Sequence, residues 1–344
     1  MRKLHHAFEC DYRYIPAHHQ LSILMDICHS HDMQHDLVLR GSGIFLDDIL
    51  SAKKRISVEQ MQQVLKNISA FSHQHDIHFL FGQRSLITPF HEAHHSLLYA
   101  NTIAEALHAY VKFSSLLCPW LTPQSFESQN KLYLYWLDEN NPDNQHLIES
   151  AMSAVQSLTR QLYGKKLPWQ YEFHANEPEY IEQYWVHLGD DVEFNRPMNM
   201  MILDRQYLYT PLPNASSILA KSSQKQAQSH YEKMGIEQSF LVVLYQYLMQ
   251  NIQHNIQLEH TAEYFGMSPA TLKRKLKKHH THFQAQVDQC RLHTAIKLYR
   301  INGYKTEQVS QYLQINDANN FRRTFKRWSG MSPHAISSFS MIKT

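Results

Sequence analysis

Cysteine is scarce in this chain of 344 residues, and the few that occur lie far apart in the sequence. The four residues form no CxxC pair; they are Cys10, Cys28, Cys118 and Cys290. This spacing disfavours both a disulfide scaffold and a cysteine zinc site, and it fits a reducing compartment.

Long apolar segments are also lacking. The first residues, MRKLHHAFECDYRY, carry charge but no apolar core, so we expect no signal peptide. No stretch approaches the roughly 18 uninterrupted apolar residues that a bilayer span requires. We therefore expect a soluble, cytoplasmic protein with no membrane partner.

The charge is distributed unevenly along the chain. Residues 252–344 hold 14 Lys and Arg against 5 Asp and Glu, whereas the other 251 residues hold 19 against 26. The length favours two domains, and such an asymmetry favours a polyanion-binding module joined to a domain of another kind. A run of solvated surface charge is the simpler alternative.

Residues 1–213 show the mixed pattern of an α+β domain. Helical spacing of apolar residues predicts helices at Leu21–Cys28, Val58–Phe71, Thr102–Leu117 and Gln145–Leu162. Short segments rich in aromatic and β-branched residues predict strands at Ile77–Phe81, Lys131–Leu137, Trp169–Phe173 and Met200–Leu203.

Pro211 and Pro213 close this region, and residues 214–235 are rich in Ser, Gln and Lys and end at Gly235. We interpret 214–235 as a linker. From residue 236 to 344 the pattern is helical almost throughout, which predicts an all-α second domain.

The basic segment contains a helix, a turn and a second helix. Gly266 can adopt positive φ in the turn, and Ser268 followed by Pro269 is a helix-start signal. Leu272 and Leu276 lie four residues apart and face inward. The residues left on the outer face are Ala270, Lys273, Arg274 and Lys277. This is the plan of a DNA-binding helix-turn-helix.

The same plan recurs about 48 residues later. Thr306 is the expected cap of a first helix and Asp317 that of a second, in which Phe321 and Phe325 repeat the spacing of Leu272 and Leu276. The outer residues are Ala318, Asn319, Asn320, Arg322, Arg323 and Lys326. Asn suits adenine, Arg suits guanine, and Lys more often contacts phosphate. A helix over about Gln286–Ile301 is expected to link the two units.

These motifs resemble the tandem helix-turn-helix domain of the AraC/XylS family of regulators. The resemblance runs from about Leu258 to Pro333, and its most specific parts are GMSPATLKRKL and FRRTFKRWSGMSP, with Phe283 and Arg291 between them. It implies that the outer residues of both second helices enter the major groove of promoter DNA. The sequence departs from the family at Gln314, where Gly is usual in the second turn.

The first domain is similar to the effector domain of a subset of this family. The similar segments are TIAEALHAY, WQYEFHANEPEY, VEFNRPMNMMILD and YTPLPNA, whereas the arabinose-binding type is only distantly similar. The resemblance implies a small-molecule effector, such as an amino acid, a fatty acid or a signal molecule. It further implies RNA polymerase as a partner and favours a homodimer, because the DNA sites of such proteins are often repeated.

Nothing in the sequence identifies the effector or its site. Tyr133, Tyr135 and Trp136 fit a pocket lining, but core packing is the favoured interpretation. Arg13, Lys53 and Lys54 fit an anionic head group, but surface charge is favoured.

The main rival is the literal HExxH motif from His91 to His95, which on a helix would bind zinc and make Glu92 the base of a peptidase. The resemblance to the effector domain implies strand and loop in this segment, and no convincing third ligand follows, so we expect neither an enzyme nor a metal or other cofactor. Metal sensing by two histidine groups is a further alternative; these are His73, His75 and His78, and His91, His94 and His95.

We therefore predict a DNA-binding transcription regulator, with activation the usual mode in this family. The alternative is a constitutive DNA binder whose first domain serves only for assembly.

Overall fold

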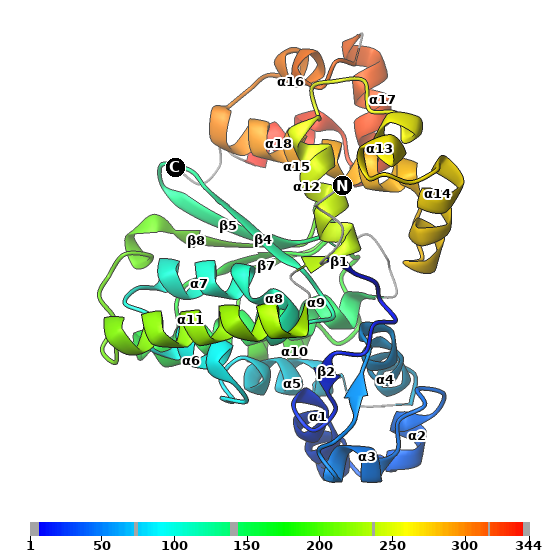
Figure 1. The fold of residues 1–344 in the computed structure, drawn as a ribbon. Coiled ribbons are helices and arrows are strands. Elements are labelled where there is room, and N and C mark those ends of the chain that lie inside the picture. The colour runs from blue at the N-terminus through cyan, green and yellow to red at the C-terminus, as the bar shows by residue number, and fades with distance from the viewer. Residues whose placement is uncertain (1–6, 72–74, 138–143, 236–237, 316, 340–344) are drawn as a thin grey trace. The chain divides into compact units, whose positions relative to one another are not determined.

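The computed structural model describes residues 7–71, 75–137, 144–235, 238–315 and 317–339 (Figure 1). By their contacts they form two compact units, each of which is described by itself. The larger unit contains Cys10–Asn195 and Asn199–Glu237, and the smaller one contains the residues up to Glu9, Arg196–Met198 and those from Gln238 onward.

A five-stranded sheet lies in the larger unit, in the order β4-β5-β8-β6-β7. The strands are β4 (Pro123–Glu127), β5 (Lys131–Trp136), β6 (Gln170–Glu172), β7 (Val192–Glu193) and β8 (Met200–Asp204). All neighbours pair antiparallel except β6 and β7, which are parallel. Three predicted strands are confirmed as β5, β6 and β8, and the α+β interpretation of this region is confirmed with them.

The larger unit also contains eleven described α-helices. They are α1 (Gln20–Ser30), α2 (His35–Leu39), α3 (Leu46–Leu50), α4 (Val58–Phe71), α5 (Ile77–Ser85), α6 (Glu92–Leu98), α7 (Ile103–Lys112), α8 (Ser114–Leu117), α9 (Gln145–Tyr163), α10 (Ile181–His187) and α11 (Ser217–Met234). A short ladder joins β2 (Ile15–Pro16) to β3 (Arg55–Ile56), and a 3₁₀ turn spans Arg205–Tyr207. The helix predicted over 102–117 is divided at Phe113 into α7 and α8.

The strand predicted at Ile77–Phe81 is wrong, because this segment is the first half of α5 and packs closely on α9. A short apolar run fits a buried helix as well as a strand, and its neighbours decide between them. Here, Ser150 and Ser153 of α9 donate hydrogen bonds of 2.9 and 2.8 Å to the carbonyl oxygens of His78 and Phe79. These hydrogen bonds require a close approach of the two helices, which the small residues Gly82 of α5 and Ser150 and Ser153 of α9 allow.

The segment interpreted as a linker, 214–235, is mostly the helix α11. Its buried residues, Ala220, Ser223, Ala227 and Tyr231, lie three or four apart and form one face, and the helix packs on α6 (Figure 1). Because three of these four side chains are small, the stripe has little apolar character in the sequence. The composition of residues 214–235 is therefore similar to that of a linker, although the segment is a packed helix.

Within its described residues, the secondary structure of the smaller unit is helical except for one short ladder. The helices are α12 (Phe240–Gln250), α13 (Leu258–Tyr264), α14 (Pro269–Lys278), α15 (Phe283–Asn302), α16 (Thr306–Tyr312), α17 (Ala318–Ser329) and α18 (Pro333–Phe339). The ladder pairs β1 (Ala7–Phe8) in parallel with β9 (Gln238–Ser239). The strand β1 thus belongs to the same unit as the last third of the chain.

No helix in the described ranges is both long and apolar enough to cross a membrane.

Candidate DNA-binding surface

The first helix-turn-helix consists of α13 and α14. Gly266 has φ of 67° in the turn between them, and the amide of Met267 donates to the carbonyl of Ala262 at 3.0 Å. The Ser268 hydroxyl accepts a hydrogen bond from the Thr271 amide at 3.1 Å, so it caps α14 as predicted. Leu272 and Leu276 are both fully buried. The outer face of α14 is fixed by these two inward contacts.

The second helix-turn-helix, which consists of α16 and α17, repeats this geometry. Gln314 has φ of 54° where the first unit has Gly266, and the amide of Ile315 donates to the carbonyl of Ser310 at 3.0 Å. Asp317 caps α17 by accepting from the Asn320 amide at 2.7 Å. The two turns therefore have the same backbone form, although one of them lacks glycine.

The predicted cap at Thr306 is wrong. Thr306 is the first residue of α16, and Lys305 occupies the cap position. The side-chain oxygen of Gln308 reaches back and accepts a hydrogen bond from the Lys305 amide at 2.8 Å. This contact satisfies the amide of the cap residue itself, as in a capping box.

The predicted outer residues of α14 lie on one exposed face of that helix. Ala270, Lys273, Arg274 and Lys277 are all exposed, and the three cations form no ion pair with any described residue. Unpaired cations on a rigid helix are available to a polyanion without first breaking a contact.

The outer face of α17 is similar but carries one internal contact. Of its predicted residues Ala318 is half-buried, and the exposed ones are Asn319, Asn320, Arg322, Arg323 and Lys326. Arg322 donates to the Asn319 side-chain oxygen at 3.0 Å and pairs with Glu307 at 3.3 Å. Arg323 and Lys326 have no ion pair within the described part of the chain, so they are the readily available cations of this helix.

Two other cations of α14 are held by the N-terminal segment. Glu9, which directly follows β1, forms salt bridges to Lys275 and to Lys278, the latter at 2.8 Å. Burial raises the pKa of Glu9, but the two lysines outweigh it and bring the pKa down to about 2. Lys275 and Lys278 are thus engaged by Glu9, and Lys278 lies beside Arg274, four residues before it on α14. Nothing in the sequence indicated this pairing, because 266 residues separate its partners.

The linking helix α15 joins the two helix-turn-helix motifs. It is longer than the predicted range, and its 20 residues span about 30 Å. Val287, Cys290, Ala295 and Leu298 are buried as predicted, and α15 packs on α12, α16, α17 and α18. Gly303, with φ of 61°, ends the helix. This continuous helix directly follows the first helix-turn-helix and packs on both helices of the second, and all of them belong to the smaller compact unit.

Two family descriptions match this chain. Residues 33–212 match the "Arabinose-binding domain of AraC transcription regulator, N-term", and residues 261–338 match a "Helix-turn-helix domain". The first match alone covers more than half of the chain. The chain belongs to the AraC family of transcription regulators. The first domain matches the arabinose-binding type, to which we expected only a distant similarity.

Relatives of known name agree with this family assignment. An ornithine utilization regulator of Pseudomonas aeruginosa is 23% identical over 54% of this chain and 55% of its own length. The regulator AdiY of Escherichia coli K12 is 32% identical over 27% of this chain and 38% of its own. This AraC-family chain therefore spans about half or less of these relatives. Family and relatives are transcription regulators, not enzymes.

A solved structure is similar over most of the chain. The transcriptional regulator CdpR of Pseudomonas aeruginosa covers 93% of this chain and 98% of its own, at 15% identity and a TM-score of 0.47.

The HExxH motif does not have the geometry of a zinc site. The segment is helical, contrary to the expected strand and loop, but His91 caps α6 and precedes its first turn. Its Nδ1 accepts from the Ala93 amide at 3.2 Å, and its Nε2 lies 3.1 Å from the carbonyl oxygen of Leu116. Both ring nitrogens are thereby engaged, and burial lowers the pKa of His91 to about 4. Within the described ranges, no three His, Cys, Asp or Glu side chains are grouped to hold a metal ion.

The other histidine group is dispersed among packing contacts. His75 stacks on Tyr180 with ring centroids 4.1 Å apart, and Nε2 of the buried His78 lies 2.9 Å from the Ser69 hydroxyl. His73 lies outside the described residues.

The aromatic residues of β5 belong to the core, as favoured. Tyr133, Tyr135 and Trp136 are buried, and the indole of Trp136 donates to the Tyr110 hydroxyl at 3.4 Å. Lys54 pairs with Asp48 at 2.6 Å. Arg13 and Lys53 are exposed, which fits surface charge.

Proposed function

We propose that α14 and α17 read promoter DNA as a pair, under the control of a small-molecule effector bound by the first domain. The observation that carries this proposal is the repeated geometry: each exposed basic helix follows the same turn and is fixed by two buried side chains. Residues 1–213 are the proposed effector and dimerisation region, and 236–344 the DNA-binding region. We further propose that the protein is an activator that contacts RNA polymerase in the cytoplasm.

Each outer residue has a proposed role that follows from its chemistry. Arg274 and Arg323 donate in a planar fork that matches the two acceptors of guanine, and Asn319 and Asn320 match adenine. Lys273, Lys277 and Lys326 neutralise phosphates and set the register, and Ala270 and Ala318 leave room for close approach. Arg322 is free for DNA once it leaves Glu307.

The test uses the full chain and a duplex that the chain selects from random sequences. We expect Arg274→Ala and Arg323→Ala each to weaken binding to that duplex by about 1–3 kcal/mol, measured by fluorescence anisotropy. Lys277→Ala should weaken binding to selected and random duplexes alike and reduce the salt slope. Lys225→Ala on α11, outside the surface, is the control. Wild-type affinity in both arginine variants would contradict the assignment of the reading helices.

A further inference from the structure

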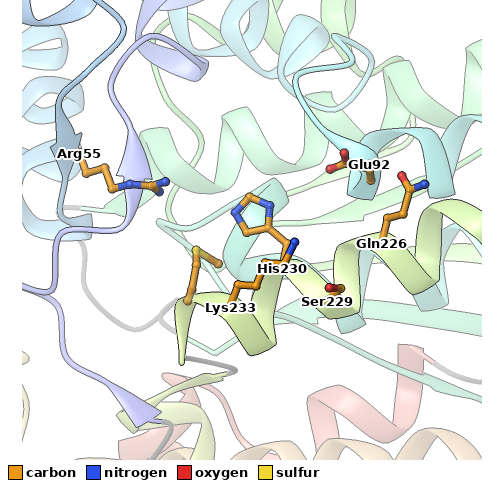
Figure 2. A pocket seen from close by; sticks show the side chains of 7 residues that line it. Arg55, Glu92, Gln226, Ser229, His230 and Lys233 are labelled. Atoms are coloured by element: carbon orange, nitrogen blue, oxygen red, sulfur yellow. The ribbon is translucent and has the colours of Figure 1, made fainter.

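A cleft of about 500 Å³ opens along the last turns of α11 within the larger unit (Figure 2). Seven residues line it: Arg55, Glu92, Gln226, Ser229, His230, Lys233 and Met234. Its volume is within the range of small-molecule sites. None of these residues was singled out as a ligand-binding residue from the sequence.

Charges of both signs face this cleft. Arg55 comes from β3, Lys233 from α11 and Glu92 from the start of α6. None of the three forms a salt bridge with any residue that the structure describes. Arg55 is held in place by the hydrogen bond of its Nη1 to the Tyr14 carbonyl, at 2.7 Å, which leaves its other donors free.

The charges are separated along the cleft. Figure 2 shows Arg55 to the left of the His230 ring and Lys233 below it, with Glu92 and Gln226 to its right. Gln226 and Lys233 are seven residues apart on one helix, which corresponds to about 10 Å along its axis. One end of the cleft is therefore cationic, and the other combines a carboxylate with an amide.

The wall behind His230 adds no positive charge near neutral pH. His91 lies against His230, with ring centroids 6.5 Å apart, and its two nitrogens are occupied as described above. Burial also lowers the pKa of His19, next to His91, to about 3. The polarity of the cleft is thus set by Arg55, Lys233 and Glu92.

We propose that this cleft is the effector site and that it binds a small amino carboxylate whose two charged groups are separated by a short aliphatic chain. The carboxylate binds Arg55 and Lys233, as planar guanidinium groups favour, and the amino group binds Glu92. Gln226 and Ser229 supply hydrogen bonds, and Met234 contacts the chain. This assignment rests on the proposed effector control and names the chemistry of the effector.

The position of the cleft on α11 gives the ligand a route to regulation. The face of α11 next to the cleft is anchored by the buried Ala227 and Tyr231, and the next described segment of the chain, β9, belongs to the DNA-binding unit. A ligand that joins Arg55 and Glu92 to the last turns of α11 tethers these turns, which precede that unit in the chain.

The test is calorimetric titration of the full chain with 5-aminopentanoate, 6-aminohexanoate, L-ornithine and L-lysine, and with hexanoate and hexylamine as singly charged controls. We expect saturable binding of at least one amino carboxylate, and at least about tenfold weaker binding of both controls. Lys233→Gln and Glu92→Gln should each weaken that binding by about tenfold or more. Lys225→Gln, a lysine on the same helix outside the cleft, should leave it unchanged.

Three results would overturn the assignment: no amino carboxylate binds at millimolar concentrations, hexanoate binds as tightly as 6-aminohexanoate, or neither Lys233→Gln nor Glu92→Gln affects binding. The same preparations are assayed for binding to the selected duplex. Retained DNA binding without ligand binding contradicts the cleft alone, whereas wild-type protein that binds no DNA contradicts the proposed function itself.

Discussion

Gln314 has φ of 54° in the turn of the second helix-turn-helix, at the position that Gly266 occupies in the first. The left-handed conformation costs a non-glycine residue about 1–2 kcal/mol, and the greater freedom of unfolded glycine offsets about 0.5–1 kcal/mol of this. Gln314→Gly should therefore stabilise the smaller unit by up to about 1 kcal/mol in urea unfolding.

Gln311→Gly is the matched control for Gln314→Gly, because Gln311 is exposed within α16. It should destabilise the protein by about 1 kcal/mol, as glycine does inside helices. Equal destabilisation by the two variants would show that the turn at Gln314 is unstrained.

A second residue with a measurable energetic role is Glu149, which is buried in α9 and accepts hydrogen bonds from Tyr184 at 2.5 Å and Tyr180 at 3.0 Å. Burial raises its pKa to about 7, although these hydrogen bonds act to lower it. Between the ordinary value of 4.5 and about 7, the folded protein holds a proton that the unfolded chain releases. This residue therefore contributes a loss of stability as the pH rises through that window.

Glu149→Gln cannot ionise, so its stability relative to wild type should rise between pH 5 and pH 8. The rise should reach at most about 3 kcal/mol, since each pKa unit corresponds to about 1.4 kcal/mol. The difference between the two proteins is the quantity to measure, because burial lowers the pKa of His78 and His94, and these two residues contribute a stability change in the opposite direction. A difference that is constant over this pH range would contradict the assignment.

Among the elements, prediction from the sequence worked where one long amphipathic stripe decides the structure. The predicted range of α4 is that observed, and α9 differs by one residue at its end. Caps with a local signal, Ser268 and Asp317, were also predictable. The strand predicted at Ile77–Phe81 failed because its helical state depends on α9, which lies some 70 residues further along the chain.

The α5–α9 contact predicts a strong effect of a single methyl group. A Cβ added at Gly82 would meet the backbone carbonyl oxygen of Ser150, which cannot move aside as a flexible side chain can. Gly82→Ala should therefore lower the free energy of unfolding by about 1–3 kcal/mol or more, despite the better helix propensity of alanine. Arg84→Ala on the exposed side of α5 is the control and should change stability little. If Gly82→Ala and Arg84→Ala were equally stable, α5 and α9 could move apart without a loss of folding free energy.

For the molecule as a whole, the charge asymmetry of the sequence was the most informative feature. It indicated the basic last third, and the duplicated motif within it predicted the exposed residues of both outer faces except Ala318, which is half-buried. The docking of β1 and Glu9 on that unit was not predictable, because a two-residue strand and one carboxylate carry no periodic signal. The cleft on α11 was missed for a related reason, since its residues come from three separate segments.

Selection of random duplexes by the full chain tests most directly whether the two helix-turn-helix motifs act together on one duplex. If α14 and α17, joined by α15, bind one side of a duplex together, the recovered sequences should contain two specified blocks. These blocks should lie about one helical turn, or about 10 base pairs, apart. In Arg323→Ala, sequence preference should relax in one block only. Recovery of a single block, or of no common sequence at all, would contradict the account.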